Sequence, residues 1–137
     1  MERLKNKIIN IEKMVLNLEK SLDKLNHHSD PDDIEYVQDS VVARFKILVD
    51  YSCKSIKIYL DFKGLSDISG APKDILKIAQ EINFLNEKEY EILIKSICLR
   101  NMASHVYDQK QYILAIETAP KTLEVIKNLL LKFKLAI

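Results

Sequence analysis

The apolar and polar positions follow a helical pattern along most of the chain. Between residues 3 and 26, aliphatic side chains recur at alternating spacings of four and three residues, which places them on one stripe of an α-helix. The stripe consists of Leu4, Ile8, Ile11, Val15, Leu18, Leu22 and Leu25. We expect it to pack inside a helical bundle, although a repeat of this kind would also suit an intermolecular coiled coil.

A second, longer helix is predicted from Pro31 to about Gly64. The segment Ser29–Asp33 combines a capping side chain, a proline in the first turn and acidic groups that favour the positive end of the helix dipole. Gly64 suits the left-handed conformation that often follows a helix. About 30 residues at 1.5 Å each would form a rod of about 45–50 Å. Such a rod suits a two-chain assembly as well as the core of a monomer.

Three further helices are predicted after the irregular segment 65–72. Pro72 begins a short helix, Asn86 caps the next one, and a final helix follows Asp108. Pro120 is predicted to kink the final helix or to break it. The pattern therefore predicts an all-α chain with one domain spanning residues 1–137.

Composition supports this fold class and excludes several others. The 137 residues include two Gly and three Pro, which favours long helices over strands and tight turns. The net charge of +1 gives no overall basic field for nucleic acid. No apolar run is long enough to cross a membrane, and no signal peptide is evident, so we expect a cytoplasmic protein without a membrane partner. Cys53 and Cys98 are expected to be reduced thiols.

The stretch from Leu99 to Asp108 carries the candidate chemistry. Here Arg100 is followed by His105 five residues later and by Tyr107 two residues after that. Given three His and six Tyr in 137 residues, this spacing would arise by chance with a probability of about 0.003. The stretch is therefore the candidate site of the protein.

A helical wheel suggests that this stretch faces a polar cleft or an interface. Arg100 lies on the side that apolar residues occupy earlier in the same helix, whereas Leu99 and Met102 lie where charged residues stood. The apolar stripe is thus predicted to change sides at about residue 98. Arg100 and His105 are about 140° apart, so they would flank a cleft on one helix, and two copies across a dyad would bring them together.

Arginine and histidine suit phosphoryl chemistry on RNA. Histidine titrates near neutrality, so His105 could take a proton from a ribose 2′-hydroxyl or give one to the leaving oxygen. Arg100 could bind phosphate and stabilise negative charge in the transition state. A buried ion-pair network that only orders an interface would explain the same residues. The polar neighbours on the same arc of the helix are Asn101, Ser104 and Asp108.

Metal binding is not expected, because the paired histidines, His27 and His28, lie in a predicted loop and lack further ligands nearby.

The residues from Arg100 to Tyr107 resemble the signature of the HEPN superfamily, Arg-x4–6-His, in its extended form Arg-x4-His-x-Tyr. The sequence is most similar to the branch of nucleotidyltransferase substrate-binding proteins, close to HepT-type toxins. Arg44-Phe45 through Lys54 is similar to the Arg-Phe-Glu…Trp-Lys helix of that branch, and the helix start at Pro72 also matches. The chain departs from the branch at three positions, where Glu, Glu and Trp are common. They are Lys46, Asp50 and Cys53.

The resemblance implies an antiparallel four- to five-helix up-and-down bundle that forms a homodimer with a shared cleft. It also implies a minimal nucleotidyltransferase protein as partner, in a toxin–antitoxin-like pair, and RNA or a nucleotide as substrate. Arg100 and His105 would support metal-independent endoribonuclease activity without a cofactor. Tyr107 would be the candidate for adenylylation, and Arg44 a supporting residue. There are two alternatives to a ribonuclease: a non-catalytic subunit that binds a nucleotide, and a purely structural dimer.

Overall fold

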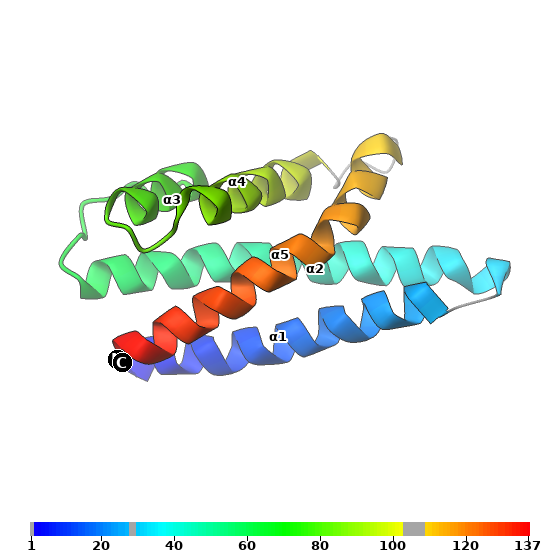
Figure 1. Ribbon diagram of the computed structural model, residues 1–137, viewed down its shortest axis with the longest axis horizontal. Coiled ribbons are helices and arrows are strands. Elements are labelled where there is room, and N and C mark those ends of the chain that lie inside the picture. Colours follow the sequence, from blue (N-terminus) through cyan, green and yellow to red (C-terminus); the bar gives the residue numbers. More distant parts are fainter. Residues whose placement is uncertain (1, 28–29, 103–108) are drawn as a thin grey trace.

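The computed structural model describes residues 2–27, 30–102 and 109–137, and the regular elements in these ranges are all helices (Figure 1). The predicted all-α fold is therefore confirmed. The helices are α1 (Glu2–His27), α2 (Pro31–Phe62), α3 (Pro72–Glu81), α4 (Glu87–Met102) and α5 (Gln109–Ala136). None of these helices is both long enough and apolar enough to cross a membrane.

The apolar stripe of α1 packs within the chain. Its first five members, from Leu4 to Leu18, are at most 5% exposed, and Leu22 and Leu25 are partly buried against the same core. The helix contacts both α2 and α5, and it lies antiparallel to α2 (Figure 1). Burial of the stripe in these contacts supplies the hydrophobic stabilisation of α1. The bundle interpretation of the repeat is confirmed for the single chain.

Local capping determines the ends of α2 as predicted. The Asp30 side chain accepts a hydrogen bond from the Asp32 amide at 3.0 Å, which satisfies one of the unpaired donors of the first turn. At the other end Gly64 has a φ of +87°, a conformation that side chains with a Cβ rarely adopt. The 32 residues of α2 make it the longest helix, and it contacts each of the other four.

The turn between α3 and α4 is ordered by a reciprocal cap. The Asn86 amide donates to Glu89 Oε1 at 3.0 Å, and the Glu89 amide donates to Asn86 Oδ1 at 2.7 Å. Glu89 is only 6% exposed, and Lys132 of α5 pairs with it at 2.6 Å. Beside this turn Phe84 stacks on Tyr59 with ring centroids 4.1 Å apart. These contacts join α2, α4 and α5 at one end of the bundle.

Helix α5 continues through Pro120, so of the two predicted alternatives, a kink and a break, the break does not occur. The helix changes direction in its N-terminal half (Figure 1), as expected where proline removes a backbone donor. Its C-terminal half lies beside α1, where Lys127 pairs with Glu19 at 3.1 Å and Lys134 with Glu12 at 3.5 Å.

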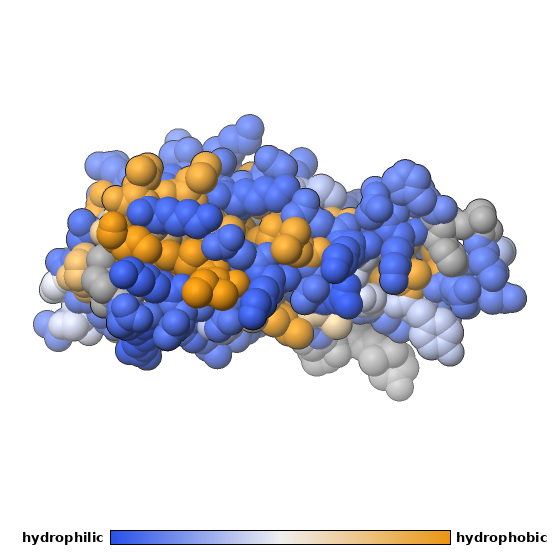
Figure 2. Space-filling model, turned by 90° about the horizontal axis from the view of Figure 1, so that it is seen from below, coloured by the Kyte–Doolittle hydropathy of each residue, from blue (hydrophilic) through white to orange (hydrophobic). Residues whose placement is uncertain are grey.

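Apolar side chains gather on the face shown in Figure 2, towards the end of the molecule where the two termini lie. The large exposed aliphatic residues of α1 and of the C-terminal half of α5 are Ile9, Leu16, Leu131 and Leu135.

Candidate functional site

A pocket of about 440 Å³ lies between α2 and the end of α4, beside the predicted motif. Its lining residues come from two stretches that are far apart in sequence. They are Lys46, Ile47 and Asp50 of α2 and Arg100 and Asn101 of α4. The first two residues of the motif thus line an open, shallow pocket on the surface between the two helices.

Arg100 is held in this pocket by two neighbours. One terminal nitrogen of its guanidinium, Nη1, donates to Asp50 Oδ1 at 2.5 Å, and the other, Nη2, donates to Asn101 Oδ1 at 2.8 Å. Asp50 also pairs with Lys54, one turn further along α2, at 3.1 Å. Because two bonds fix the plane of the guanidinium, Arg100 is oriented before any ligand binds.

A buried thiol lies close to the pocket. Burial and the negative charge of Asp50 raise the pKa of Cys53, and the positive charge of Arg100 lowers it, which together place the pKa at about 12. Cys53 therefore stays a neutral thiol at physiological pH and acts as an apolar part of the core. The three positions that depart from the resembled pattern thus gather here, with Lys46 and Asp50 lining the pocket and Cys53 within the electrostatic reach of its ion pair.

The helical wheel predicted that the apolar side of α4 changes at about residue 98, and the structure agrees with this only in part. Arg100 stays on the packed side, with 26% of its side chain exposed, and Leu99 is buried, as predicted. Met102 is 44% exposed, so the apolar residues do not exchange sides completely within α4. Helix α4 contacts α2, α3 and α5, so its buried arc is wider than the single stripe that a wheel assumes.

The two helices that flank the motif are both bonded to α2. At the end of α4, Arg100 bonds to Asp50, and at the start of α5 the Tyr112 hydroxyl donates to Asp39. Burial and this hydrogen bond raise the pKa of Tyr112 above its ordinary value. Asp39 and Asp50 are eleven residues apart, or about 16 Å along the helix. The end of α4 and the start of α5 are therefore both anchored on α2.

Four predicted site residues lie outside the residues that the structure describes. They are Ser104, His105, Tyr107 and Asp108.

Arg44 does not share the pocket of Arg100. Its Nη1 donates to the backbone oxygen of Asn17 and to Ser21 Oγ, both at 2.7 Å on α1. Arg44 and Asp50 are six residues apart, which corresponds to about 240° around α2. The helix therefore presents Arg44 to α1 and Asp50 to α4.

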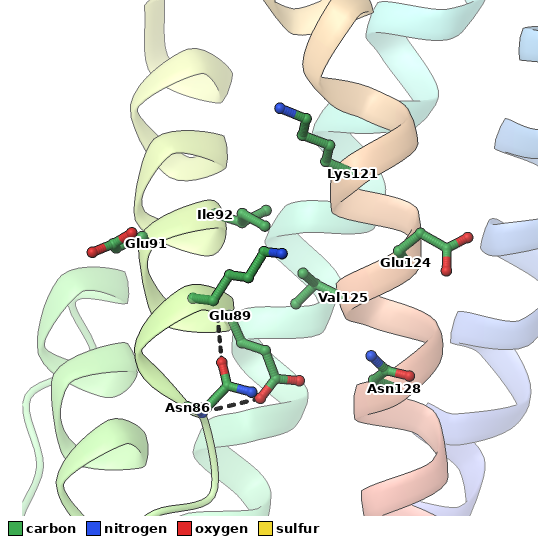
Figure 3. A pocket seen from close by; sticks show the side chains of 9 residues that line it. Asn86, Glu89, Glu91, Ile92, Lys121, Glu124, Val125 and Asn128 are labelled. Carbon is green, nitrogen blue, oxygen red and sulfur yellow. Dashed lines mark hydrogen bonds between the residues drawn. The ribbon is translucent and has the colours of Figure 1, made fainter.

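Another groove, of about 550 Å³, lies between α4 and α5 (Figure 3). Ile92 and Val125 face one another across it, and Lys121 extends into it from α5. Glu89, Glu91 and Glu124 also line it, so the groove carries both positive and negative groups, although the Glu91 and Glu124 side chains point away from its centre (Figure 3). This mixture does not select a ligand of either charge.

Lys46, Ile47 and Asp50 line the site without having been predicted for it, and Asp50 is the one that bonds to Arg100. Its partner lies 50 positions away, and such a pairing leaves no local pattern. The available signal was that an arginine on the packed side of a helix needs an anionic partner. Within the described ranges, no group of three histidine, cysteine, aspartate or glutamate side chains is arranged to hold a metal ion.

Comparison with solved structures shows that the fold is shared with several helical proteins. A structure described as a toxin–antitoxin with AMP-PNP superposes with a TM-score of 0.71 at 17% identity, covering 95% of this chain and 96% of that chain. A protein from Thermus thermophilus gives a TM-score of 0.68 at 19% identity, over 85% of this chain and 98% of that one.

A third structure is described as a tri-AMPylated Shewanella oneidensis HEPN toxin in complex with an MNT antitoxin. It gives a TM-score of 0.65 at 18% identity and covers 91% of this chain and 96% of that chain. A comparison with proteins of curated function found no match. The family model described as "Nucleotidyltransferase substrate binding protein like" matches residues 6–134. The chain therefore belongs to the nucleotidyltransferase substrate binding protein like family.

Proposed function

We propose that this protein is the helical partner of a minimal nucleotidyltransferase in a toxin–antitoxin-like pair, and that it cleaves RNA without a metal ion through Arg100 and His105. The family supports the nucleotidyltransferase partner. Structures of the same fold that are described as toxin–antitoxin complexes support the pairing. The observation that carries the chemistry is the guanidinium of Arg100, which Asp50 and Asn101 orient at a pocket beside the motif.

In this mechanism Arg100 stabilises charge and His105 transfers protons. Arg100 binds the scissile phosphate and stabilises the charge that accumulates on its oxygens as the phosphorane forms. His105 takes the proton of the ribose 2′-hydroxyl, which attacks the phosphorus, and a histidine then protonates the 5′-oxygen that leaves. The products are a 2′,3′-cyclic phosphate and a 5′-hydroxyl.

The cleft is shared by two copies in this proposal. If one straight helix continued through the motif, Arg100 and His105 would point about 140° apart, so a homodimer would place the arginine of one copy near the histidine of the other. Tyr107, two residues after His105, is the position at which the nucleotidyltransferase would attach AMP. A nucleotide there would fill the cleft and exclude RNA.

The test is RNA cleavage by the purified, unmodified protein in the presence of EDTA. We expect cleavage with cyclic phosphate ends, a loss of about 10²-fold or more in the His105→Ala variant, and a similar loss in Arg100→Gln. His27→Ala is the matched control, because His27 lies at the exposed end of α1. Intact RNA with the wild-type protein would refute the cleavage proposal.

The second candidate is a non-catalytic subunit that presents a nucleotide to the nucleotidyltransferase. The family description, which names substrate binding, favours it. Calorimetry with nucleotides, with and without the partner enzyme, separates the two, because nucleotide binding that the partner enzyme strengthens, without any cleavage of RNA, supports this candidate and not the ribonuclease.

A further inference from the structure

A smaller pocket, of about 200 Å³, lies between the C-terminal half of α1 and the N-terminal half of α2. These two helices lie side by side there (Figure 1). The lining residues are Ser21, Lys24, Tyr36, Val37, Ser40 and Arg44. The pocket is distinct from that of Arg100, because Arg44 and Asp50 lie on different sides of α2.

The lining of this pocket favours an anion. It contains two cationic side chains and three hydroxyl groups but no carboxylate. Neither Lys24 nor Arg44 forms an ion pair with any residue in the described part of the chain, so no carboxylate there competes with an incoming anion. The groove between α4 and α5 has lysines of the same kind but also three glutamates. The α1–α2 pocket therefore combines positive charge with donors that suit an oxyanion.

Arg44 is arranged in advance for such a ligand. Its Nη1 is held by the Asn17 carbonyl and Ser21 Oγ, which are neutral acceptors and leave its charge uncompensated. Ser21 is 2% exposed, and its hydroxyl also bonds to Ser40 Oγ at 2.9 Å. Partial burial of a guanidinium without a counter-charge costs desolvation free energy, and a bound oxyanion would offset that cost.

An aromatic surface lies next to these cations. Tyr36 lines the same pocket and is 76% exposed, an unusually high value for a large ring. An exposed tyrosine face beside a phosphate-binding cation is the arrangement that stacks a nucleobase while the backbone phosphate is neutralised. The two features together therefore indicate a ligand that carries both a phosphate and a base.

We propose that the α1–α2 pocket binds the phosphate of a nucleotide through Arg44, Lys24 and Ser40, with the base stacked on Tyr36. The ligand is either a free mononucleotide or one nucleotide of a single-stranded RNA, since both offer the same phosphate and base. The site does not depend on the proposed cleavage at Arg100, and its failure would leave that proposal standing.

The experiment measures binding to the full-length protein in the His105→Ala background, so that no RNA is consumed. Calorimetry with AMP and with inorganic phosphate, and anisotropy with a labelled short oligo(A), test the two sources of the ligand. We expect Tyr36→Ala to weaken AMP or oligo(A) binding by about tenfold and Tyr36→Phe to change it by less than about twofold, because the stacking ring is retained. Lys24→Gln should weaken it by about three- to fivefold.

Matched controls keep the test decisive. Lys24 and Tyr36 are both exposed, so their replacement should leave the fold intact, which circular dichroism checks. Lys88→Gln, an exposed lysine of the α4–α5 groove, should leave binding unchanged. Tighter binding of oligo(A) than of AMP identifies RNA as the source, and equal binding identifies a free nucleotide. No binding of either, or binding that Tyr36→Ala and Lys24→Gln leave unaltered, would overturn the proposal.

Discussion

The ion pair between Arg100 and Asp50 should couple α4 to α2 by about 1 kcal/mol. The perturbation is a double-mutant cycle with Asp50→Asn, Arg100→Gln and the variant that carries both. Each single change also alters other contacts, because Asp50 pairs with Lys54 and Arg100 bonds to Asn101. The cycle cancels these effects and leaves the interaction between the two charges.

The magnitude follows from the geometry and the exposure of the pair. Two unit charges about 4 Å apart attract by about 4 kcal/mol at the effective dielectric constant of a protein surface. The side chains of Arg100 and Asp50 are 26% and 36% exposed, so water screens much of this attraction and desolvation offsets more of it. Exposed pairs retain about 0.2–1 kcal/mol. The N···O distance of 2.5 Å and the partial burial place this pair at the upper end of that range.

The assay is urea unfolding of the four proteins followed by circular dichroism, at low and at high salt. The matched control is the Lys57–Asp61 pair, which has the same N···O distance of 2.5 Å and exposures of 22% and 38% but joins residues one turn apart on α2. Its coupling should be about 0.3–0.5 kcal/mol. A coupling for Arg100 and Asp50 no larger than that of the control, or one that grows with added salt, would refute the reasoning.

Two stability predictions concern other buried groups. Glu89→Gln should lower the free energy of unfolding by about 1–2 kcal/mol, because glutamine can still accept a hydrogen bond from the Asn86 amide but no longer neutralises Lys132. Glu89→Ala should lower it by about 1 kcal/mol more, because the cap is lost as well. Equal losses of unfolding free energy for the two variants, measured by urea unfolding, would contradict this prediction. The pKa of Cys53 is raised to about 12 in the folded protein from 9.0, so the unfolded state loses this proton first as pH rises. Its stabilising contribution is complete below about pH 9 and is lost as pH rises towards about 12. The stability of the wild type relative to Cys53→Ala should therefore fall by about 1.4 kcal/mol per pH unit above about pH 9, and urea midpoints that stay parallel for the two proteins would contradict it.

The sequence alone determined the features that depend on neighbours along the chain. The periodic stripe of α1, the cap at Asp30, the glycine after α2 and the Asn86 cap were all predicted and were all found. Each is a local rule, because helical hydrogen bonds and caps join residues at most about four positions apart. Pro120 follows the same kind of rule, since a kink or a break was predicted there and α5 continues through it with a change of direction (Figure 1).

Only the tertiary structure decided which side chains meet. Asp50 and Arg100 are 50 positions apart, and Arg44 reaches Ser21 across 23 positions, so no spacing in the sequence could reveal either contact. The sequence placed Arg44 and Arg100 together as candidates for one site. The structure separates them, because α2 presents Arg44 to α1 and, on a different side, Asp50 to Arg100 of α4. Helix α2 contacts the other four helices, so its residues face several different neighbours. Which neighbour each side chain meets is decided by how the helices pack.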